Sequence, residues 1–226
     1  MSEFGVIIVA AGQGKRMMSE LPKQFLNVAS RPILVHSIER FLDYDNRIEI
    51  VIVLNADHLP EWERIKEEYL PGISIQIAIG GKERFDSVKS GLDAIKTSRF
   101  VAIHDAVRPC VDQATIQRTF KAAKIYGSAI PVMPLKDSIR QLEGDTSKVV
   151  DRNNYRVVQT PQTFDYNKIA QAYRYPIDNS VTDDATIYQS HFGEIHLVDG
   201  NYENLKITTQ EDLLIAEVLL NKKLPN

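Results

Sequence analysis

Cysteine is almost absent from this sequence of 226 residues, since Cys110 is the only one. A single cysteine excludes an intrachain disulfide and favours a reducing compartment, so we expect a cytoplasmic protein. The five histidines show no His-x-x-x-His spacing, and no Cys-x-x-Cys pair is possible, so a zinc ion held by protein ligands alone is not expected. The sequence leaves the identity of any metal ligand unknown. Cys110 follows Pro109 in an apolar stretch, which indicates a packing residue rather than a nucleophile.

Long hydrophobic runs and an excess of positive charge are also missing. No stretch approaches the roughly 18 apolar residues of a membrane span, so no membrane partner is expected. Ser2 and Glu3 stand where a secretory leader would carry positive charge, and we expect neither a leader nor a second catalytic domain after Asn226. The net charge of −3 argues against a nucleic-acid partner. A hydrophobic share of 43% is typical of a globular protein, and we expect one domain over residues 1–226.

The most informative stretch lies near the start of the chain. Phe4 to Val9 is apolar and β-branched, as in a strand buried on both faces. Small residues follow it and allow the backbone to approach a ligand closely. Cations come next, before and after Glu20. The residues of this loop that we single out are Ala10, Ala11, Gly12, Gly14, Lys15, Arg16 and Lys23.

The spacing of this loop excludes two well-known phosphate-binding motifs. A Walker loop needs Lys-Ser or Lys-Thr after its last glycine, but Gly14 precedes Lys15 and Arg16. A dinucleotide fingerprint needs a third glycine where this chain has Met17. Backbone N–H groups and cations together are suited to binding a nucleoside triphosphate. An ordinary strand-to-helix turn can have the same sequence pattern.

Strands and helices alternate along most of the chain, which predicts a three-layer α/β fold with a mostly parallel sheet. The expected strands are Phe4 to Val9, Ile48 to Leu54, Ile73 to Ile79, Phe100 to Ile103, Ala129 to Val132 and Glu194 to Val198. The expected helices are Pro32 to Leu42, Leu59 to Tyr69, one with core residues Phe85 to Ile95, Asp112 to Tyr126, Tyr166 to Tyr173, Asp183 to His191 and Leu213 to Leu220.

The segment at about residues 135–157 breaks this alternation. Two short strands around the polar tip Glu143-Gly144-Asp145 would form a projecting hairpin. Such an arm cannot bury itself alone, so a partner subunit is expected to cover it.

Two further motifs follow expected strands, at the edge where ligands bind in open α/β sheets. Gly80 and Gly81 can bring backbone groups to a base edge, with Ser87 adding a hydroxyl, or they can form a simple turn before a helix. Asp105, with Arg108 three residues later, can be a site carboxylate or a residue that stabilises a turn.

Taken together, these motifs carry a family resemblance over nearly the whole chain. Their order is Ala-Ala-Gly-x-Gly-x-Arg-Met, Pro-Lys-Gln, Gly-Gly-x-x-Arg-x-x-Ser-Val, His-Asp-x-x-Arg-Pro, Val-Asp-Arg, Thr-Pro-Gln-x-Phe, Thr-Asp-Asp and Asn-x-Lys-Ile-Thr. The first loop is similar to that of sugar-nucleotide pyrophosphorylases and cytidylyltransferases, and the full order resembles the 2-C-methyl-D-erythritol 4-phosphate cytidylyltransferase family. The resemblance implies a Rossmann-like sandwich, a homodimer formed through the arm, and CMP transfer from CTP to a polyol phosphate with Mg²⁺, held mainly by the CTP phosphates.

The resemblance also implies a role for individual residues. Arg16, Lys23, Arg152 and Lys206 would be catalytic, with Arg152 supplied by the neighbouring subunit. The residues implied for CTP binding are Ala10, Ala11, Gly12, Gly14, Gly81, Lys82, Ser87, Asp105 and Ala106. Those implied around the acceptor are Arg108, Ser138, Arg152, Thr160 and Thr182.

The sequence leaves two other functions open. Val107 and Ser138 depart from residues common in the family, Ala and Thr, and ribitol-5-phosphate cytidylyltransferase uses the same loop on a related acceptor. The run Val150-Asp-Arg152 and Val158 to Gln162 favours methylerythritol phosphate. A non-catalytic nucleotide sensor is the other alternative, against which Arg16, Lys23 and Lys206 speak, because binding alone needs fewer cations.

Overall fold

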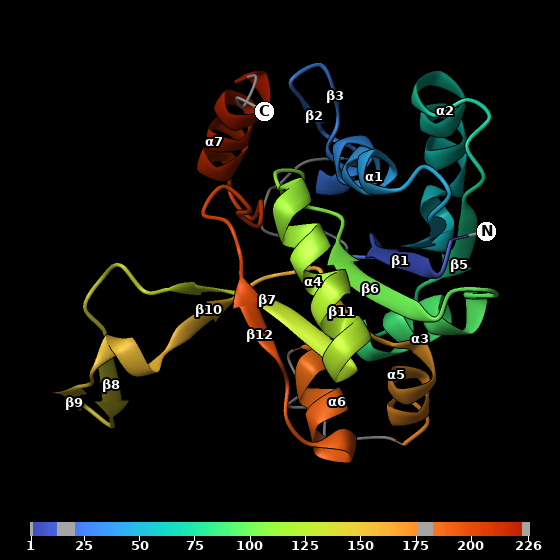
Figure 1. Ribbon diagram of the computed structural model, residues 1–226. Coiled ribbons are helices and arrows are strands. Elements are labelled where there is room, and N and C mark those ends of the chain that lie inside the picture. The colour runs from blue at the N-terminus through green and yellow to red at the C-terminus, as the bar shows by residue number, and fades with distance from the viewer. Residues whose placement is uncertain (1, 13–20, 176–182, 223–226) are drawn as a thin grey trace.

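The protein forms a sheet with helices on both faces and one arm that projects from the body (Figure 1). The structure is a computed structural model and describes residues 2–12, 21–175 and 183–222. The sequence-based prediction of a three-layer α/β fold is confirmed.

The main sheet has eight strands, and its centre is parallel. Strand order is β10-β7-β11-β6-β1-β4-β5, with β12 paired to β7. The parallel centre consists of β1 (Phe4–Val9), β4 (Glu49–Leu54), β5 (Gln76–Ile79) and β6 (Phe100–Asp105). The remaining strands are β7 (Ser128–Pro134), β10 (Arg156–Val158), β11 (Gln162–Asp165) and β12 (Leu197–Asp199). Of these, β11 runs antiparallel to β6, so the sheet is mixed and mostly parallel.

Two expected strands begin three residues later than predicted: β12 at Leu197 instead of Glu194, and β5 at Gln76 instead of Ile73. Strand β5 starts at Gln76, which pairs with Val51, whereas we expected the strand from Ile73. In this register Ile73 would lie opposite Ile48, before β4 begins, so it has no strand beside it. Ile73 instead packs against the core as a partly buried residue.

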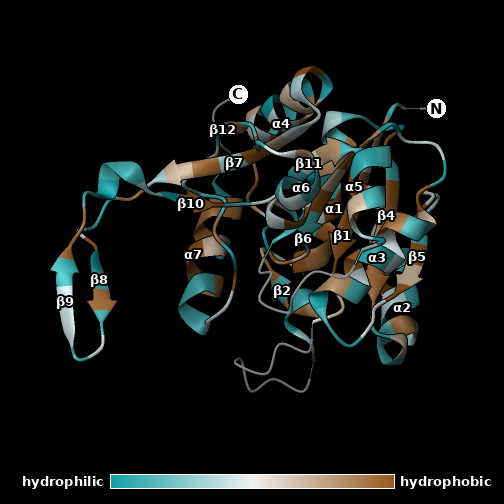
Figure 2. Cartoon of the chain, turned by 90° about the horizontal axis from the view of Figure 1, so that it is seen from below, coloured by the Kyte–Doolittle hydropathy of each residue, from teal (hydrophilic) through white to brown (hydrophobic). Residues whose placement is uncertain are grey.

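The core divides into two layers because successive side chains of a strand point to opposite faces. In β1, Val6 and Ile8 join one cluster, whereas Ile7 joins the other. Helices α1 (Ile33–Tyr44), α2 (Leu59–Tyr69) and α4 (Gln113–Tyr126) cover the first face. Helices α3 (Arg84–Ala94), α5 (Tyr166–Ala172) and α6 (Asp184–Phe192) cover the second. Figure 2 shows the hydrophobic strands enclosed between these helices.

Helix ends follow the capping residues in the sequence. Asp112 caps α4 by accepting a hydrogen bond from the Thr115 N–H, and Gly127 ends that helix with a φ of 86°. A capping box formed by Thr209 and Asp212 begins α7 (Gln210–Asn221). Helix α7 packs beside a small hairpin of β2 (Asn27–Val28) and β3 (Arg31–Pro32).

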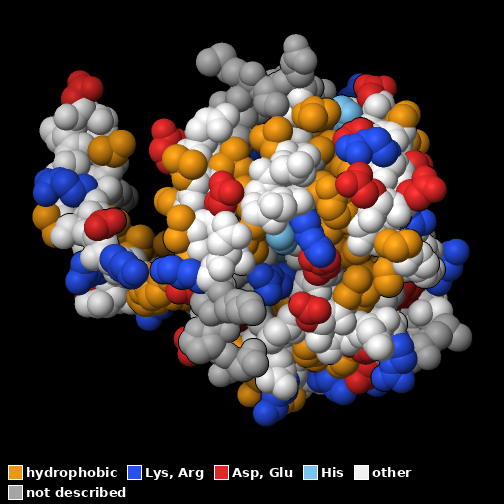
Figure 3. All heavy atoms as spheres, turned by 90° about the horizontal axis from the view of Figure 1, so that it is seen from above, with side chains coloured by type: hydrophobic (Ala, Val, Ile, Leu, Met, Phe, Trp, Pro, Cys, Tyr) orange, Lys and Arg blue, Asp and Glu red, His pale blue; other side chains and the backbone are white. Residues whose placement is uncertain are grey.

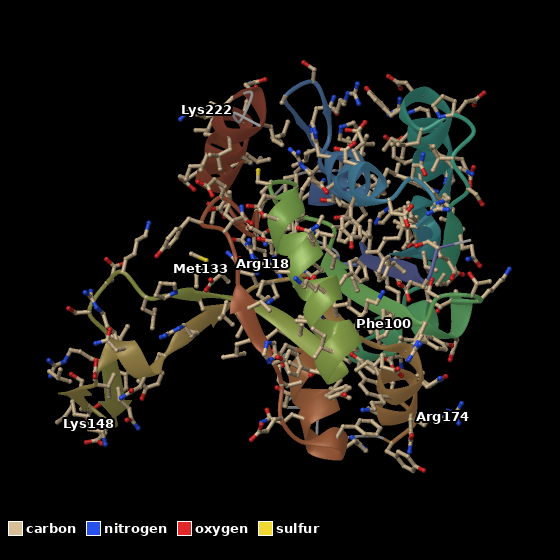
Figure 4. The ribbon with its side chains drawn as sticks, viewed as in Figure 1. Phe100, Arg118, Met133, Lys148, Arg174 and Lys222 are labelled. Carbon is tan, nitrogen blue, oxygen red and sulfur yellow. The ribbon has the colours of Figure 1, made fainter. Side chains whose placement is uncertain are left out.

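The arm leaves the body after β7 and returns through β10. Its hairpin of β8 (Arg140–Glu143) and β9 (Thr146–Val149) turns at Gly144, as the sequence predicts. In Figure 3 the arm stands apart from the body and carries charges of both signs beside hydrophobic side chains. Figure 4 places Met133 at its root, on β7, and Lys148 at its far end.

None of the helices in the described part of the chain has the length and apolar character needed to cross a membrane.

Candidate active site

The candidate site lies at the carboxyl ends of the parallel strands. The chain runs β1, β4, β5 in one direction across the sheet and then returns to place β6 on the other side of β1. This reversal is the point at which open α/β sheets bind ligands. Val9 and Asp105, the last residues of β1 and β6, are directly paired there. A cleft of about 760 Å³ opens beside them.

Ten of the residues that we expected in the site line this cleft. They are Ala10, Ala11, Gly12, Lys23, Gly81, Lys82, Ser87, Asp105, Ala106 and Lys206. Seven lining residues had no predicted role: Val9, Gln24, Asn55, Glu83, Arg84, Val107 and Thr208. Gly14, Arg16 and Thr182 lie outside the described residues.

The first loop is fixed at its two described ends. The Ala10 N–H donates to the Val53 carbonyl at 2.8 Å, which continues the sheet by one residue. Gln24, which is buried, donates its side-chain amide to the Ala10 carbonyl at 2.7 Å. The ammonium of Lys23 donates to the Ile207 carbonyl at 3.0 Å and so ties this loop to the segment that carries Lys206. Gln24 belongs to the Pro-Lys-Gln motif, so the sequence could have indicated it as a site residue.

Both residues of the pair after β5 must be glycine because neighbouring atoms leave no room for a side chain. A Cβ on Gly80 would stand 2.4 Å from the Cβ of Ala11, and one on Gly81 would stand 2.2 Å from the Cβ of Asp86. The Gly81 N–H donates to Ser87 Oγ at 3.2 Å, while the Ser87 hydroxyl donates to the Glu83 carbonyl. In this structure Ser87 therefore shapes the loop that faces the cleft.

One carboxylate oxygen of Asp105 forms ion pairs with two cations. Both Arg108 Nε and Lys206 Nζ lie 3.1 Å from Asp105 Oδ2. Burial opposes ionisation of Asp105, but the charges of Lys206, Arg108 and Arg84 outweigh it and hold the pKa of this carboxyl well below its usual range. Asp105 is therefore an anion at neutral pH, and it fixes the position of Lys206 at the edge of the cleft.

Thr160 contacts the end of β6. Its hydroxyl accepts a hydrogen bond from the Asp105 N–H at 3.1 Å and lies 3.0 Å from His104 Nδ1. Burial lowers the pKa of His104 to about 4, so the ring is neutral, and its Nε2 contacts the Arg108 carbonyl. That carbonyl can only accept, so Nε2 carries the proton and Nδ1 accepts from Thr160. Thr160 thus lies behind Asp105 and is not among the residues that line the cleft, and its predicted contact with the acceptor stays a prediction.

Arg108 is likewise committed to protein partners. Besides Asp105, it donates from Nη1 to the Asn204 carbonyl at 2.8 Å, and its side chain is largely buried. It is not among the residues that line the cleft, and its predicted contact with the acceptor stays a prediction.

Arg84 is a cleft residue that we did not predict. Its guanidinium makes two hydrogen bonds of 2.6 Å to the buried carboxylate of Asp184. Burial opposes the charge of Arg84, but Asp184 outweighs it and raises the pKa of Arg84. The hydroxyl of Tyr173 donates to Asp184 at 2.5 Å. Arg84 is the arginine of the Gly-Gly-x-x-Arg motif, so the sequence could have indicated it as a site residue. Its partner Asp184 lies 100 residues away, and no local pattern indicates that pairing.

Ser138 and Arg152 are exposed residues of the arm and do not line the cleft of their own chain. Arg152 donates from Nη1 to the Lys136 carbonyl, which holds the two sides of the arm together. The arm that carries both residues projects from the body (Figure 1).

Other catalytic centres find little support. Cys110 is buried, and burial raises the pKa of its thiol to about 11, which keeps it protonated. Among residues 2–12, 21–175 and 183–222, no three His, Cys, Asp or Glu side chains converge on a possible metal position.

Comparison with known proteins gives one family. A family model described as 2-C-methyl-D-erythritol 4-phosphate cytidylyltransferase matches residues 4–222. The chain is 42% identical over 214 residues to the protein of that name from Bacteroides fragilis, covering 95% of this chain and 98% of the relative. It is 41% identical over 215 residues to the one from Phocaeicola vulgatus, with the same coverage.

Solved structures agree with the sequence relatives. The 2-C-methyl-D-erythritol 4-phosphate cytidylyltransferase from Thermus thermophilus superposes with a TM-score of 0.79 at 32% identity, covering 95% of this chain and 97% of that one. The 4-diphosphocytidyl-2C-methyl-D-erythritol synthase from Anaerococcus prevotii superposes with a TM-score of 0.83 at 29% identity, covering 96% and 95%.

Proposed function

This chain belongs to the 2-C-methyl-D-erythritol 4-phosphate cytidylyltransferase family and is therefore a nucleotidyltransferase, and from this premise we propose the reaction of its cleft. The enzyme transfers CMP from CTP to 2-C-methyl-D-erythritol 4-phosphate. An oxygen of the acceptor phosphate bonds to the α-phosphorus as the bond from that phosphorus to the departing pyrophosphate breaks. The product is 4-diphosphocytidyl-2-C-methyl-D-erythritol, an intermediate of non-mevalonate isoprenoid synthesis. The observation that supports this proposal is that Lys23 and Lys206 line the same cleft.

The nucleotide half of the cleft is defined by small residues. Ala10 to Gly12 and the pair Gly80-Gly81 keep the strand ends open to the approach of a triphosphate and a base. Lys23 and Arg16 would neutralise the triphosphate, while Gly14, Lys82 and Ala106 complete the nucleotide contacts.

The chemistry needs no enzyme nucleophile, because the acceptor phosphate is already an anion. Its difficulty is that two anions must meet, so cations contribute by positioning them and by screening the charge that develops. Asp105 holds Lys206 beside the cleft, and the Lys23 ammonium binds the Ile207 carbonyl, one residue from Lys206. The Lys23 ammonium thus lies beside the backbone from which the Lys206 side chain extends.

We propose Mg²⁺ as the cofactor, held mainly by the phosphates of CTP. The described residues offer no three-ligand group, whereas Asp105 provides one ionised carboxylate in the cleft. This donor set fits a magnesium ion that takes most of its ligands from phosphate and water. When bound, the ion would neutralise phosphate charge.

We further propose a homodimer in which the arm of one subunit completes the acceptor side of the other. Leu142 and Val149 lie on the same face of the arm hairpin, 79% and 75% exposed, and an isolated two-stranded hairpin is marginally stable. A second subunit would cover this face and bring Arg152 and Ser138 to the acceptor. Thr182 would come from the subunit whose site receives the arm. The reduced Cys110 suits the cytoplasm as the site of action.

The test is pyrophosphate release from CTP with two acceptors. We expect faster turnover with 2-C-methyl-D-erythritol 4-phosphate than with ribitol 5-phosphate, because the relatives described above bear the methylerythritol name. Preference for ribitol 5-phosphate would contradict the proposed acceptor. Release of no pyrophosphate with either would instead favour a nucleotide-sensing module.

A further inference from the structure

A closed ring of hydrogen bonds lies behind the cleft. The Asp105 carboxylate accepts from Arg108 Nε, and Arg108 Nη1 donates to the Asn204 carbonyl at 2.8 Å. The side-chain Nδ2 of Asn204 donates to the Thr160 carbonyl, also at 2.8 Å. The Thr160 hydroxyl then accepts from the Asp105 N–H and closes the ring. Three segments far apart in the sequence are joined in this way.

Asn204 is the least accessible member of the ring. It is 0% exposed and does not line the cleft, so it cannot touch a ligand there. Its Oδ1 has no hydrogen-bond partner among the residues that the structure describes. A buried oxygen without a partner destabilises a fold, so close packing alone does not explain an amide at this position. The hydrogen bond from Nδ2 to the Thr160 carbonyl does explain it, whereas the carbonyl that accepts from Arg108 belongs to the backbone and would be present in any residue.

The position of Asn204 determines the position of the backbone at Lys206. Asn204 is tied to Thr160, and three residues later the Ile207 N–H donates to the Val107 carbonyl at 2.9 Å. Lys206 lies between these two anchors, and its ammonium reaches Asp105 at 3.1 Å. If the first anchor is lost, the backbone before Lys206 can shift. Misplacement by about 1 Å can slow a reaction by up to roughly 10²-fold.

We propose that Asn204 is a positioning residue for the acceptor phosphate. By joining Arg108 to the strand end at Thr160, it sets the place of Lys206 relative to Asp105. This inference rests on the proposed function, in which Lys206 binds the acceptor phosphate. It assigns to Asn204 a larger effect on the acceptor than on CTP. Asn204 hydrogen-bonds to Arg108 and Thr160, which are implied around the acceptor, and it reaches Asp105, which is implied in CTP binding, only through them.

Asn201 offers a matched control on the same segment. It is also a buried amide, and its Nδ2 donates to the Cys110 carbonyl at 3.2 Å while its Oδ1 accepts from the Thr115 hydroxyl at 3.3 Å. These side-chain hydrogen bonds lead toward α4 and away from the ring. Removing either amide therefore destabilises the fold through a similar loss of buried hydrogen bonds, but only the Asn204 side chain anchors the backbone to Thr160 before Lys206.

The test compares Asn204→Ala with Asn201→Ala by thermal unfolding and steady-state kinetics. We expect similar losses of stability, but only Asn204→Ala should raise the KM for 2-C-methyl-D-erythritol 4-phosphate, roughly tenfold, as the loss of one buried hydrogen bond predicts. The KM for CTP should stay within about twofold. Equal kinetics in the two variants would overturn the inference.

Thr160→Val tests the same ring if Asn204→Ala does not fold. Valine keeps the shape of threonine but removes the hydroxyl that accepts from the Asp105 N–H and donates to His104. The KM for the acceptor should therefore again rise, and by a larger factor than the KM for CTP. Thr160→Ser, which keeps the hydroxyl, should restore the wild-type KM. An acceptor KM unchanged in Thr160→Val would contradict the role of the ring. A wild-type enzyme that releases no pyrophosphate with either polyol phosphate would overturn the proposed function and this inference together.

Discussion

The cleft and the arm differ in how much of their surface a single chain buries. The cleft is formed within one chain, on strands whose core residues Val6, Ile7 and Ile8 are completely buried. The arm leaves its hydrophobic Leu142 and Val149 exposed and projects from the body, and its Arg152 does not line the cleft of its own chain. Burial on both faces of the sheet therefore orders the first region without help, whereas the arm offers a surface that the proposed dimer would bury. On the proposed function, CTP binding belongs to each chain and acceptor binding to the pair.

The largest effect should come from removing a cation of the cleft. Lys23→Ala should lower kcat by about 10²–10³, because one charge that stabilises the transition state is lost. Stability should change little, since the Lys23 ammonium donates to a loop carbonyl at the rim of the cleft rather than packing in the core. Pyrophosphate release and thermal unfolding of the purified variant measure the two. Near-normal turnover would contradict the catalytic role of the cleft.

An intermediate effect should come from the exposed face of the arm. Leu142→Asp should weaken the dimer by about 2–3 kcal/mol, roughly 30- to 150-fold, because burying a leucine contributes about that much. Gln141→Asp is the matched control, since Gln141 lies on the opposite face of the hairpin. Sedimentation at several concentrations measures the dissociation. If both variants dissociate alike, the hydrophobic face of the arm does not form the interface.

The smallest effect should come from Glu49, at the opposite end of the sheet from the cleft. Its carboxylate accepts hydrogen bonds from the backbone N–H groups of Lys96, Thr97 and Ser98. Burial opposes its ionisation, but these hydrogen bonds outweigh it and lower its pKa to about 2 from an ordinary 4.5. Glu49→Gln should lower the free energy of unfolding by about 1–2 kcal/mol at pH 7 and leave kcat unchanged.

The pH dependence of that loss has a definite sign. A folded-state pKa below the unfolded value stabilises the protein fully above about pH 4.5, and the contribution declines as the pH falls toward 2. The difference between wild type and Glu49→Gln should therefore shrink between pH 7 and pH 3 in denaturant titrations. A constant difference would show that Glu49 acts without its charge.

Within the described residues, sequence patterns predicted six of the eight strands of the main sheet (all but β10 and β11), the helices α1 to α7 and ten of the residues that line the cleft. These features depend on local periodicity and on motifs within a few residues. The patterns did not predict the orientation of Thr160 or the pairing of Arg84 with Asp184. Those contacts join segments 55 and 100 residues apart, and local spacing says nothing about them. The role of Asn204 was hidden for the same reason, although it stands in the Asn-x-Lys motif.

The claim that the acceptor side is completed by a second chain has a direct test in mixed dimers. If Arg152 acts across the interface, then a dimer of one Lys23→Ala subunit and one Arg152→Ala subunit contains one intact site. Random mixing of the two inactive variants should then restore about a quarter of the wild-type kcat, since half of the dimers are mixed and each has one working site of two. If Arg152 acts within its own chain, every site lacks one cation and mixing restores nothing, which would contradict the account.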